Sequence, residues 1–274
     1  MVTTLKIERT DTNSIGNILG NIKGDSYNID VKKLGDIIVR EVTYRQRGKR
    51  LNLRKLHKAV GVQSSCLLCD QMARDTEIFE IFSSNIFTQR LCSNFALKLV
   101  QMLGEINSNL KVGIIDYDSN CIDIVRPLLS VCDKLTVVTQ SIEEYMYISD
   151  EILMDMGATF LLTKNFASLN VCDLIIAPNK IDVPLSLKDR CVVITTELPT
   201  YMIGGQIYFE YDIDLPSEIE LLRPKWCSAI EFGSALYIAE NLYTLGSVVP
   251  KLCRSESVVQ TLPSMVKMLN NLVA

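Results

Sequence analysis

Four polar residues with oxygen-bearing side chains cluster where an apolar run ends. The run covers residues 112–115, and Asp116, Asp118, Ser119 and Asn120 follow it. A short apolar run that ends in polar residues is typical of a buried parallel strand. The turn suits three roles, which the sequence leaves open. It could cap a helix, hold a cationic or hydroxyl-bearing ligand, or support a metal-bridged phosphate or an altered nucleotide pose.

The elements that must position this turn lie between residues 111 and 196. We expect five short strands there, separated by helical or irregular connections: residues 112–116, 135–139, 159–163, 173–177 and 191–195. Alternating strands and crossovers predict a parallel sheet in an α/β fold. The expected Rossmann-like strand order is 3-2-1-4-5, with a ligand crevice at the carboxyl ends of strands one and four.

Other candidate ligand-binding residues follow from that crevice. Thr139 ends the second strand, and Pro178, Asn179 and Lys180 follow the fourth. Because the carboxyl ends of parallel strands share one edge, these residues should lie near the turn at Asp116. Ser141 and Glu144 have the spacing of a capping box for the next helix, and Gly157 is its expected end.

Residues 91–196 resemble the NAD(P)-binding half of the shikimate dehydrogenase and methylenetetrahydrofolate dehydrogenase group. The resemblance rests on a helix around residues 95–103 that leads into strand one, and on the sequence Cys-Asp-Leu-Ile-Ile-Ala-Pro at residues 172–178. It covers roughly a third of the chain and is one of pattern. It implies a Rossmann-type domain with a dinucleotide cofactor.

The turn after strand one departs from that group. A glycine-rich turn normally lets the backbone approach a pyrophosphate, but Asp116, Asp118 and Cys121 occupy the glycine positions here. Two like unit charges ~4 Å apart repel by about 1 kcal/mol in water and about 4 kcal/mol at a protein surface. The second strand ends in Thr139 and Gln140, with neither an acid for a ribose nor an arginine for a 2′-phosphate. The sequence therefore disfavours NAD(P) in its usual pose and leaves the cofactor unknown.

A basic cluster lies near the N-terminus. Arg45, Arg47, Lys49 and Arg50 are candidate anion-binding residues, and residues 45–58 contain no acid. The cluster fits either a solvated helix face or a site for phosphate or a nucleic-acid backbone. His57 has no carboxylate nearby in sequence, so we expect it on a helix face rather than in acid–base catalysis.

Composition narrows the class of protein. Hydrophobic residues make up 48% of the 274 residues and the net charge is -4, which fits a well-buried globular protein without a global field for nucleic acid. Neither a membrane span nor a signal peptide is apparent, so we expect a cytoplasmic protein. The odd count of nine cysteines indicates thiols rather than a disulfide scaffold. Cys66 and Cys69 form a lone C-x-x-C, interpreted as two thiols in a helix, and no metal site is expected.

Two domains are expected: a small α+β domain over residues 1–86, which carries the basic patch, and a Rossmann-like domain with a C-terminal helical extension over residues 87–274. Helices are expected at residues 75–87, 90–103, 226–245 and 257–273. Small residues at Ala229 and Gly233 would permit close helix packing across a homodimer.

The sequence identifies no catalytic residue and does not decide whether the chain is an enzyme. The first hypothesis is a small metabolite or nucleotide bound in a non-standard mode, with divergent oxidoreductase chemistry as one form of it. The alternatives are a non-catalytic regulatory or interaction protein that has lost cofactor binding, and a local nucleic-acid binder through residues 45–58.

Overall fold

The computed structural model describes residues 1–9, 24–47, 50–61, 67–104 and 109–273. Its chain forms two compact units. Unit 1 comprises Met1–Phe87 and Leu215–Gly246, and unit 2 comprises Thr88–Asp214 and Ser247–Ala274. Residues 215–246 thus pack with unit 1, although they follow the Rossmann-like strands in the chain. The division at residue 86 into two folding domains stays a prediction.

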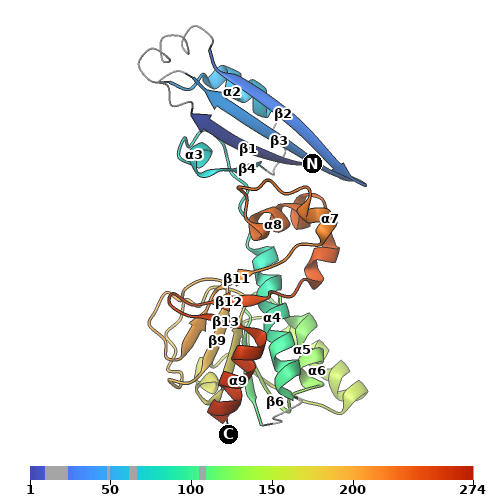
Figure 1. Cartoon of the computed structure of the whole chain (residues 1–274). Coiled ribbons are helices and arrows are strands. Elements are labelled where there is room, and N and C mark those ends of the chain that lie inside the picture. Colours follow the sequence, from blue (N-terminus) through green and yellow to red (C-terminus); the bar gives the residue numbers. More distant parts are fainter. Residues whose placement is uncertain (10–23, 48–49, 62–66, 105–108, 274) are drawn as a thin grey trace. The chain divides into compact units, whose positions relative to one another are not determined.

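Unit 1 contains a four-stranded sheet with the order β2-β3-β1-β4 (Figure 1). Its N-terminal elements are β1 (Val2–Arg9), β2 (Ser26–Leu34), β3 (Ile37–Gln46), α2 (Leu53–Val60), β4 (Leu67–Cys69) and α3 (Gln71–Arg74). The returning segment adds α7 (Ser217–Glu220) and α8 (Ala229–Ala239). β1 pairs in parallel with β3 and β4, whereas β2 and β3 form an antiparallel hairpin. This is the small α+β unit expected from the sequence.

The core of unit 1 lies between the sheet and α2. Leu56, Ala59 and Val60 of α2 are buried against Leu5 and Val42 of the sheet. Three apolar residues at helical spacing on a basic helix bury one face and leave the cations in water. β1 is buried over most of its length. Neighbouring strands flank it on both sides, so it is a central strand.

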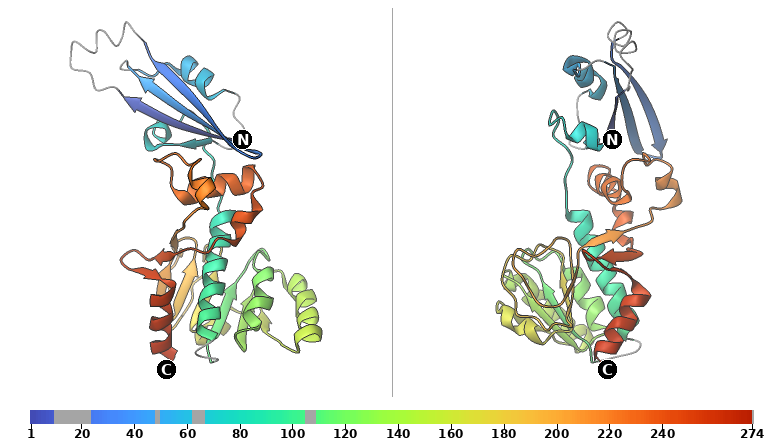
Figure 2. Two further views of the ribbon diagram at one scale, coloured as in Figure 1. Left: turned by 45° about the vertical axis from the view of Figure 1, so that its right-hand side comes forward. Right: turned by 60° about the vertical axis from the view of Figure 1, so that its left-hand side comes forward.

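Unit 2 contains the Rossmann-like sheet, seen in two further views in Figure 2. Its six strands have the order β10-β9-β8-β5-β6-β7, and every neighbouring pair is parallel. The strands are β5 (Lys111–Ile115), β6 (Lys134–Val138), β7 (Leu161–Thr163), β8 (Leu174–Ala177), β9 (Val192–Thr195) and β10 (Gln206–Tyr208). The predicted order 3-2-1-4-5 is confirmed, and β10 adds a sixth strand beside the fifth.

Helices and a 3-10 segment connect or flank these strands. They are α4 (Ile86–Gly104), α5 (Ile122–Leu129), α6 (Ile142–Met156), η1 (Phe166–Val171) and α9 (Leu262–Val273). A small antiparallel sheet of β11 (Glu210–Asp212), β12 (Leu252–Arg254) and β13 (Val259–Thr261) precedes α9. η2 (Tyr243–Ser247) follows α8.

One glycine shows how closely η1 approaches the sheet. A Cβ added to Gly113 of β5 would lie 2.7 Å from Leu169 Cδ2 and 3.1 Å from Cys172 Sγ. Leu169 and Cys172 belong to a buried cluster that also includes Ile115 and Ile175. The β7–β8 crossover therefore packs directly onto β5, and any larger residue at position 113 would require the Leu169 side chain to move.

Several local predictions need correction. The helix predicted at residues 75–87 does not form: residues 75–85 are not helical, and the next helix, α4, begins at Ile86. Asp75 is the C-cap of α3, and Glu77 adopts a positive φ of 52°. Cys69 lies in β4 rather than in a helix, and Cys66 lies outside the described residues. α6 ends at Gly157 with a left-handed φ of 65°, as the sequence predicts.

Candidate functional site

The Asp116 side chain closes the turn that follows β5. Asp116 is 1% exposed. Its Oδ1 accepts a hydrogen bond from the Asn120 amide at 3.0 Å, and its Oδ2 accepts from the Cys121 amide at 2.8 Å. These amides belong to the two residues that precede α5, and Cys121, at the N-cap position, makes no side-chain cap bond of its own. The carboxyl group therefore caps the turn that leads into α5.

Tyr145 of α6 completes this arrangement. Its hydroxyl is buried and donates a hydrogen bond to Asp116 Oδ2. Burial raises the pKa of Tyr145, and the neighbouring Asp116 raises it further. The carboxyl oxygens of Asp116 thus accept three hydrogen bonds, two from backbone amides and one from a phenol.

This geometry matters for cofactor binding because a pyrophosphate in an ordinary Rossmann site lies against the turn between the first strand and the next helix. Here that turn holds the Asp116 carboxyl group, which accepts hydrogen bonds from two of the turn's own amides. The first turn of α5 also carries Asp123, which pairs with Arg90 of α4. The protein's own acid thus stands where the ordinary pose would place the diphosphate.

The turn adopts its shape without glycine. Ser119 has a positive φ of 60°, a conformation that glycine adopts far more readily than other residues. Asn120 contributes its amide to the Asp116 cap. The three roles left open for the turn stay predictions: Asp116 caps the turn itself, and Asp118 is exposed.

A second group of polar side chains gathers at the carboxyl edge. Asn179, which follows β8, donates from Nδ2 to Asp118 Oδ2 at 3.3 Å. Gln89 of α4 donates from Nε2 to Asn179 Oδ1 at 2.5 Å. The predicted neighbours Asp118 and Asn179 are thus brought together, and Gln89 extends the row. Lys180 lies beside Glu197, with its Nζ 3.9 Å from the nearer carboxyl oxygen.

The remaining predicted ligand residues have structural partners. Thr139 is buried, and its Oγ1 accepts from the Ser141 amide at 3.0 Å. The Pro178 carbonyl accepts from Thr196 Oγ1 at 2.8 Å. The predicted capping box at Ser141 is wrong, because Ser141 Oγ makes no cap bond and lies 3.5 Å from the Tyr117 carbonyl instead.

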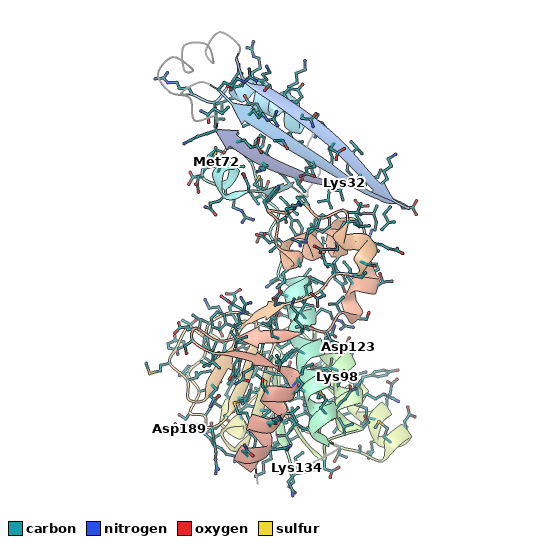
Figure 3. The ribbon with its side chains drawn as sticks, viewed as in Figure 1. Lys32, Met72, Lys98, Asp123, Lys134 and Asp189 are labelled. Atoms are coloured by element: carbon teal, nitrogen blue, oxygen red, sulfur yellow. The ribbon has the colours of Figure 1, made fainter. Side chains whose placement is uncertain are left out.

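Two residues of this edge escape sequence reasoning. Tyr145 sits on α6 and Gln89 on α4, far from the Asp116 turn in the chain. A tyrosine in the first turns of the helix after strand two is the only hint for Tyr145. Gln89 leaves no local signal, since it belongs to the helix that precedes strand one. Figure 3 labels Asp123, in the first turn of α5, and Lys134, the first residue of β6.

The basic cluster of unit 1 is partly engaged. Arg45 Nε lies 3.2 Å from Glu8 Oε2, and the Arg47 amide donates to Asp25. Arg50 is exposed, while Lys49 lies outside the described residues. His57 is exposed on α2 and packs edge-on against the Phe79 ring. Anion or nucleic-acid binding through this cluster stays a prediction.

Two kinds of feature do not occur in the ranges that the structure describes. Within these ranges, no three histidine, cysteine or acidic residues come together in a group that could hold a metal ion. No helix in the described part of the chain is long and apolar enough to cross a membrane.

Comparison with known proteins gives no family. No family model matches the chain, and no curated protein matches it. Among solved structures, 5-ketofructose reductase from Gluconobacter sp. strain CHM43, in its ligand-free form, has 11% identity and a TM-score of 0.32 over 99% of this chain and 98% of its own. Shikimate 5-dehydrogenase from Thermus thermophilus, in complex with shikimate, has 9% identity and a TM-score of 0.29 over 100% and 99%.

A third match is CAD from Helicobacter pylori, complexed with NADP(H), with 11% identity and a TM-score of 0.28 over 67% of this chain. This chain spans 43% of the length of that protein. At these scores the likeness says nothing about function. The Rossmann-like fold of unit 2 rests on its strand order.

Proposed function

We propose that unit 2 binds a small hydroxyl-bearing or cationic metabolite, or a nucleotide in a non-standard mode, at the carboxyl edge of its sheet. The observation that carries this proposal is the Asp116 cap. Its carboxyl group accepts hydrogen bonds from the Asn120 and Cys121 amides in the turn that a pyrophosphate would ordinarily approach. The carboxyl edge of the sheet therefore offers a ligand oxygen-bearing side chains in place of a glycine-rich backbone.

The groups at the edge fit such a ligand. Asp118 is exposed, and Asn179 is only half-buried. A carboxylate is an acceptor, and an amide both donates and accepts, so the pair suits sugar hydroxyls or an ammonium or sulfonium group. A divergent oxidoreductase is compatible with this arrangement only if its nicotinamide cofactor lies away from the α5 terminus.

Thermal unfolding with a panel of ligands tests the proposal. The panel is adenosine, S-adenosylmethionine, spermidine, NAD(H), NADP(H) and inorganic pyrophosphate. A ligand at 100 times its Kd stabilises the folded state by about 2.7 kcal/mol, which gives a clear rise in Tm. We expect stabilisation by a hydroxyl-bearing or cationic compound and none by pyrophosphate.

Two variants locate the site. Asp118→Asn and Asn179→Ala should each weaken binding, because they change the exposed pair at the edge. Asp133→Asn, which replaces an exposed acid at the other end of the sheet, is the matched control. Micromolar NAD or NADP binding with the diphosphate against residues 116–121 would contradict the proposal.

A specific observation favours the second candidate, a non-catalytic interaction protein. Helix α6 exposes a set of large apolar side chains: Met146, Tyr147, Leu153 and Met154. Met154 is 86% exposed. Apolar groups gathered on one helix often mark a protein-binding surface.

Sedimentation of the whole chain tests this candidate, including the expected homodimer. If α6 mediates self-association, Met154→Glu should lower the average mass at a given concentration. Met202→Glu, at a 99% exposed position outside α6, should not. Equal masses for the wild type and both variants would remove self-association through α6.

A further inference from the structure

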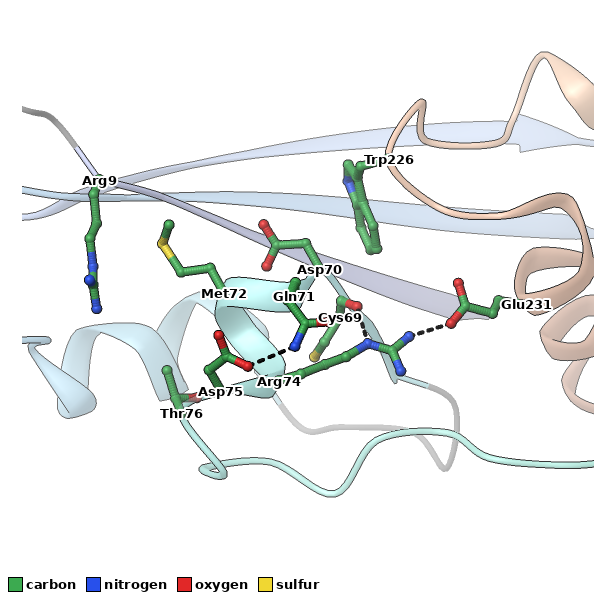
Figure 4. Close-up of a pocket in the computed structure, with 10 residues that line it drawn as sticks. All are labelled: Arg9, Cys69, Asp70, Gln71, Met72, Arg74, Asp75, Thr76, Trp226 and Glu231. Carbon is green, nitrogen blue, oxygen red and sulfur yellow. Dashed lines mark hydrogen bonds and ion pairs between the residues drawn. The ribbon is translucent and has the colours of Figure 1, made fainter. Parts of the chain in front are cut away.

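Unit 1 contains a cavity of about 770 Å³ that is separate from the sheet edge of unit 2 (Figure 4). Side chains from the end of β1, from the β4–α3 segment and from the segment that leads into α8 line it. The cavity falls within the size range of small-molecule sites. An inference about this cavity does not rest on the function proposed for unit 2, so an experiment can contradict either one without the other.

The first informative group is the indole of Trp226. Its Nε1 is buried and has no hydrogen-bond partner among the described residues. A buried N–H donor without an acceptor is costly, and such groups are rare in folded proteins. In Figure 4 the indole nitrogen lies on the side of the ring that faces Asp70. Within the described residues, no acceptor lies within hydrogen-bond distance of this nitrogen.

Two arginines add donors. Arg74 is held in place by Nε, which donates to the Cys69 carbonyl at 2.9 Å, and by Nη2, which lies 2.5 Å from Glu231 Oε1. Arg9 donates from Nε to Gln46 Oε1 at 3.1 Å. A guanidinium group carries five N–H donors in a fixed plane, so both residues retain donors for a ligand carboxylate.

Asp70 provides hydrogen-bond acceptors and a negative charge. Its Oδ1 accepts from the Ala73 amide at 2.9 Å and its Oδ2 accepts from the Ile7 amide at 3.2 Å. Each carboxyl oxygen can accept a further hydrogen bond. Burial raises the pKa of Asp70. A ligand ammonium would supply the compensating charge.

The charge balance of the lining disfavours a simple anion. The lining carries Arg9 and Arg74 against Asp70, Asp75 and Glu231, which is two positive and three negative groups. A dianion such as phosphate would meet a net negative lining. A molecule with both an acidic and a basic group would meet a partner for each.

We infer that this cavity binds a free zwitterion of the amino-acid class. The ligand ammonium faces Asp70, and its carboxylate accepts from the Trp226 N–H and the Arg74 guanidinium. Met72 and the indole ring supply an apolar surface for the ligand side chain.

The chain itself provides the probe, because Trp226 is its only tryptophan. Tryptophan fluorescence of the full chain is titrated with non-aromatic L-amino acids. The matched probes are their N-acetyl derivatives, which lack the ammonium, and their amides, which lack the carboxylate. We expect a saturable change with at least one amino acid. Each derivative should bind at least about tenfold more weakly, since it leaves one charged group of the cavity without its partner.

Variants tie the signal to the cavity. Asp70→Asn keeps an acceptor for α3 and should weaken binding at least about tenfold. Trp226→Phe removes the N–H and is followed by titration calorimetry, in which binding should weaken about tenfold. Asp36→Asn, at an exposed turn of the same unit, should bind like the wild type. Circular dichroism establishes that each variant is folded.

Three outcomes overturn the inference. The first is that no amino acid changes the fluorescence or releases heat at millimolar concentration. The second is that N-acetyl derivatives bind as tightly as the free amino acids, because the ammonium would then be unrecognised. The third is that Trp226→Phe and Asp36→Asn bind alike while both are folded.

Discussion

The turn after β5 and the cavity beside α3 differ in whether their buried polar groups have hydrogen-bond partners. At the turn, the Asp116 carboxyl group accepts three hydrogen bonds from residues of its own unit. In the cavity, the Trp226 N–H is buried with no acceptor in the described part of the chain. Polar groups that satisfy one another stabilise a fold without a ligand, whereas an unsatisfied donor has something to gain from one. The comparison therefore distinguishes a turn whose buried polar groups are satisfied within unit 2 from a cavity whose buried donor a ligand could satisfy.

The strongest way to break this comparison is Asp116→Ala. The change leaves two backbone amides and the Tyr145 hydroxyl without their acceptor inside unit 2. We expect the free energy of unfolding to fall by about 3–5 kcal/mol, because each buried donor left unpaired carries a penalty. Urea unfolding followed by circular dichroism measures the loss.

Asp118→Ala is the control for this change. Asp118 lies two residues away, is exposed and makes one hydrogen bond at 3.3 Å. Its replacement should change the stability by no more than about 0.5 kcal/mol. Equal effects at the two positions would show that the Asp116 cap does not stabilise the turn.

Sequence reasoning reached the sheet more readily than either site. The five strands and their order follow from apolar runs and alternating crossovers, which are local signals. The turn was located correctly as well, since polar residues end the first run. Its role could not be chosen from three alternatives, because the sequence does not show that the Asp116 carboxyl group turns back onto the amides of its own turn or that Tyr145 of another helix donates to it. The Ser141 prediction failed for the same reason: the structure places Ser141 Oγ near the Tyr117 carbonyl, in a different turn.

The cavity lay beyond sequence reasoning altogether. Arg9, Asp70 and Trp226 come from three segments that are far apart in the chain. The C-terminal half was expected to continue the Rossmann-like domain, yet residues 215–246 pack with unit 1. No periodic signal in the sequence marks where a chain leaves a unit and returns to it. Here the returning segment supplies Trp226 and Glu231 to the lining of the cavity.

Alkaline pH should sharpen the contrast between the two units. Burial raises the pKa of Cys92 and Cys191 in unit 2 to about 12, and that of Cys69 in unit 1 to about 12. The folded state keeps these protons while unfolded thiols ionise, so stability is complete below about pH 9 and falls as the pH rises toward 12. Each thiol contributes a loss of up to about 1.4 kcal/mol per pH unit in that window.

Among the described cysteines, six buried thiols lie in unit 2 and two in unit 1: Cys92, Cys121, Cys132, Cys172, Cys191 and Cys253, against Cys69 and Cys227. Unit 2 should therefore lose stability more steeply. Trp226 fluorescence reports on unit 1, and far-UV circular dichroism reports on both units. In urea titrations between pH 8 and 11, the urea concentration at the unfolding midpoint should begin to fall at a lower pH when it is followed by circular dichroism than when it is followed by Trp226 fluorescence. Midpoints that stay coincident, or that do not move with pH, would contradict this expectation.

Tyr145→Phe probes one bond of the Asp116 cap. The substitution keeps the buried ring and removes the hydroxyl that donates to Asp116. We expect a loss of about 1–2 kcal/mol, since hydrogen bonds to charged groups are stronger than the average. Tyr147→Phe is the matched control on the same helix, at a 68% exposed position. Urea unfolding of both variants should show an effect at residue 145 and almost none at residue 147.

Trp226→Phe makes the equivalent change in the cavity and, apart from the control substitutions, should have the smallest effect. Loss of the larger ring costs about 1 kcal/mol of packing, but removal of a buried donor without an acceptor returns about 1–3 kcal/mol. The two contributions oppose each other, so the ligand-free stability should change by no more than about 1 kcal/mol, with either sign. Urea unfolding followed by circular dichroism measures it, because the variant lacks the fluorophore. A loss above about 2 kcal/mol would mean that the N–H already has a partner in the free protein, and the contrast with Tyr145 would disappear. A change near zero for Trp226→Phe, beside a clear loss for Tyr145→Phe, would show that the Tyr145 hydroxyl stabilises the fold and that the Trp226 N–H does not.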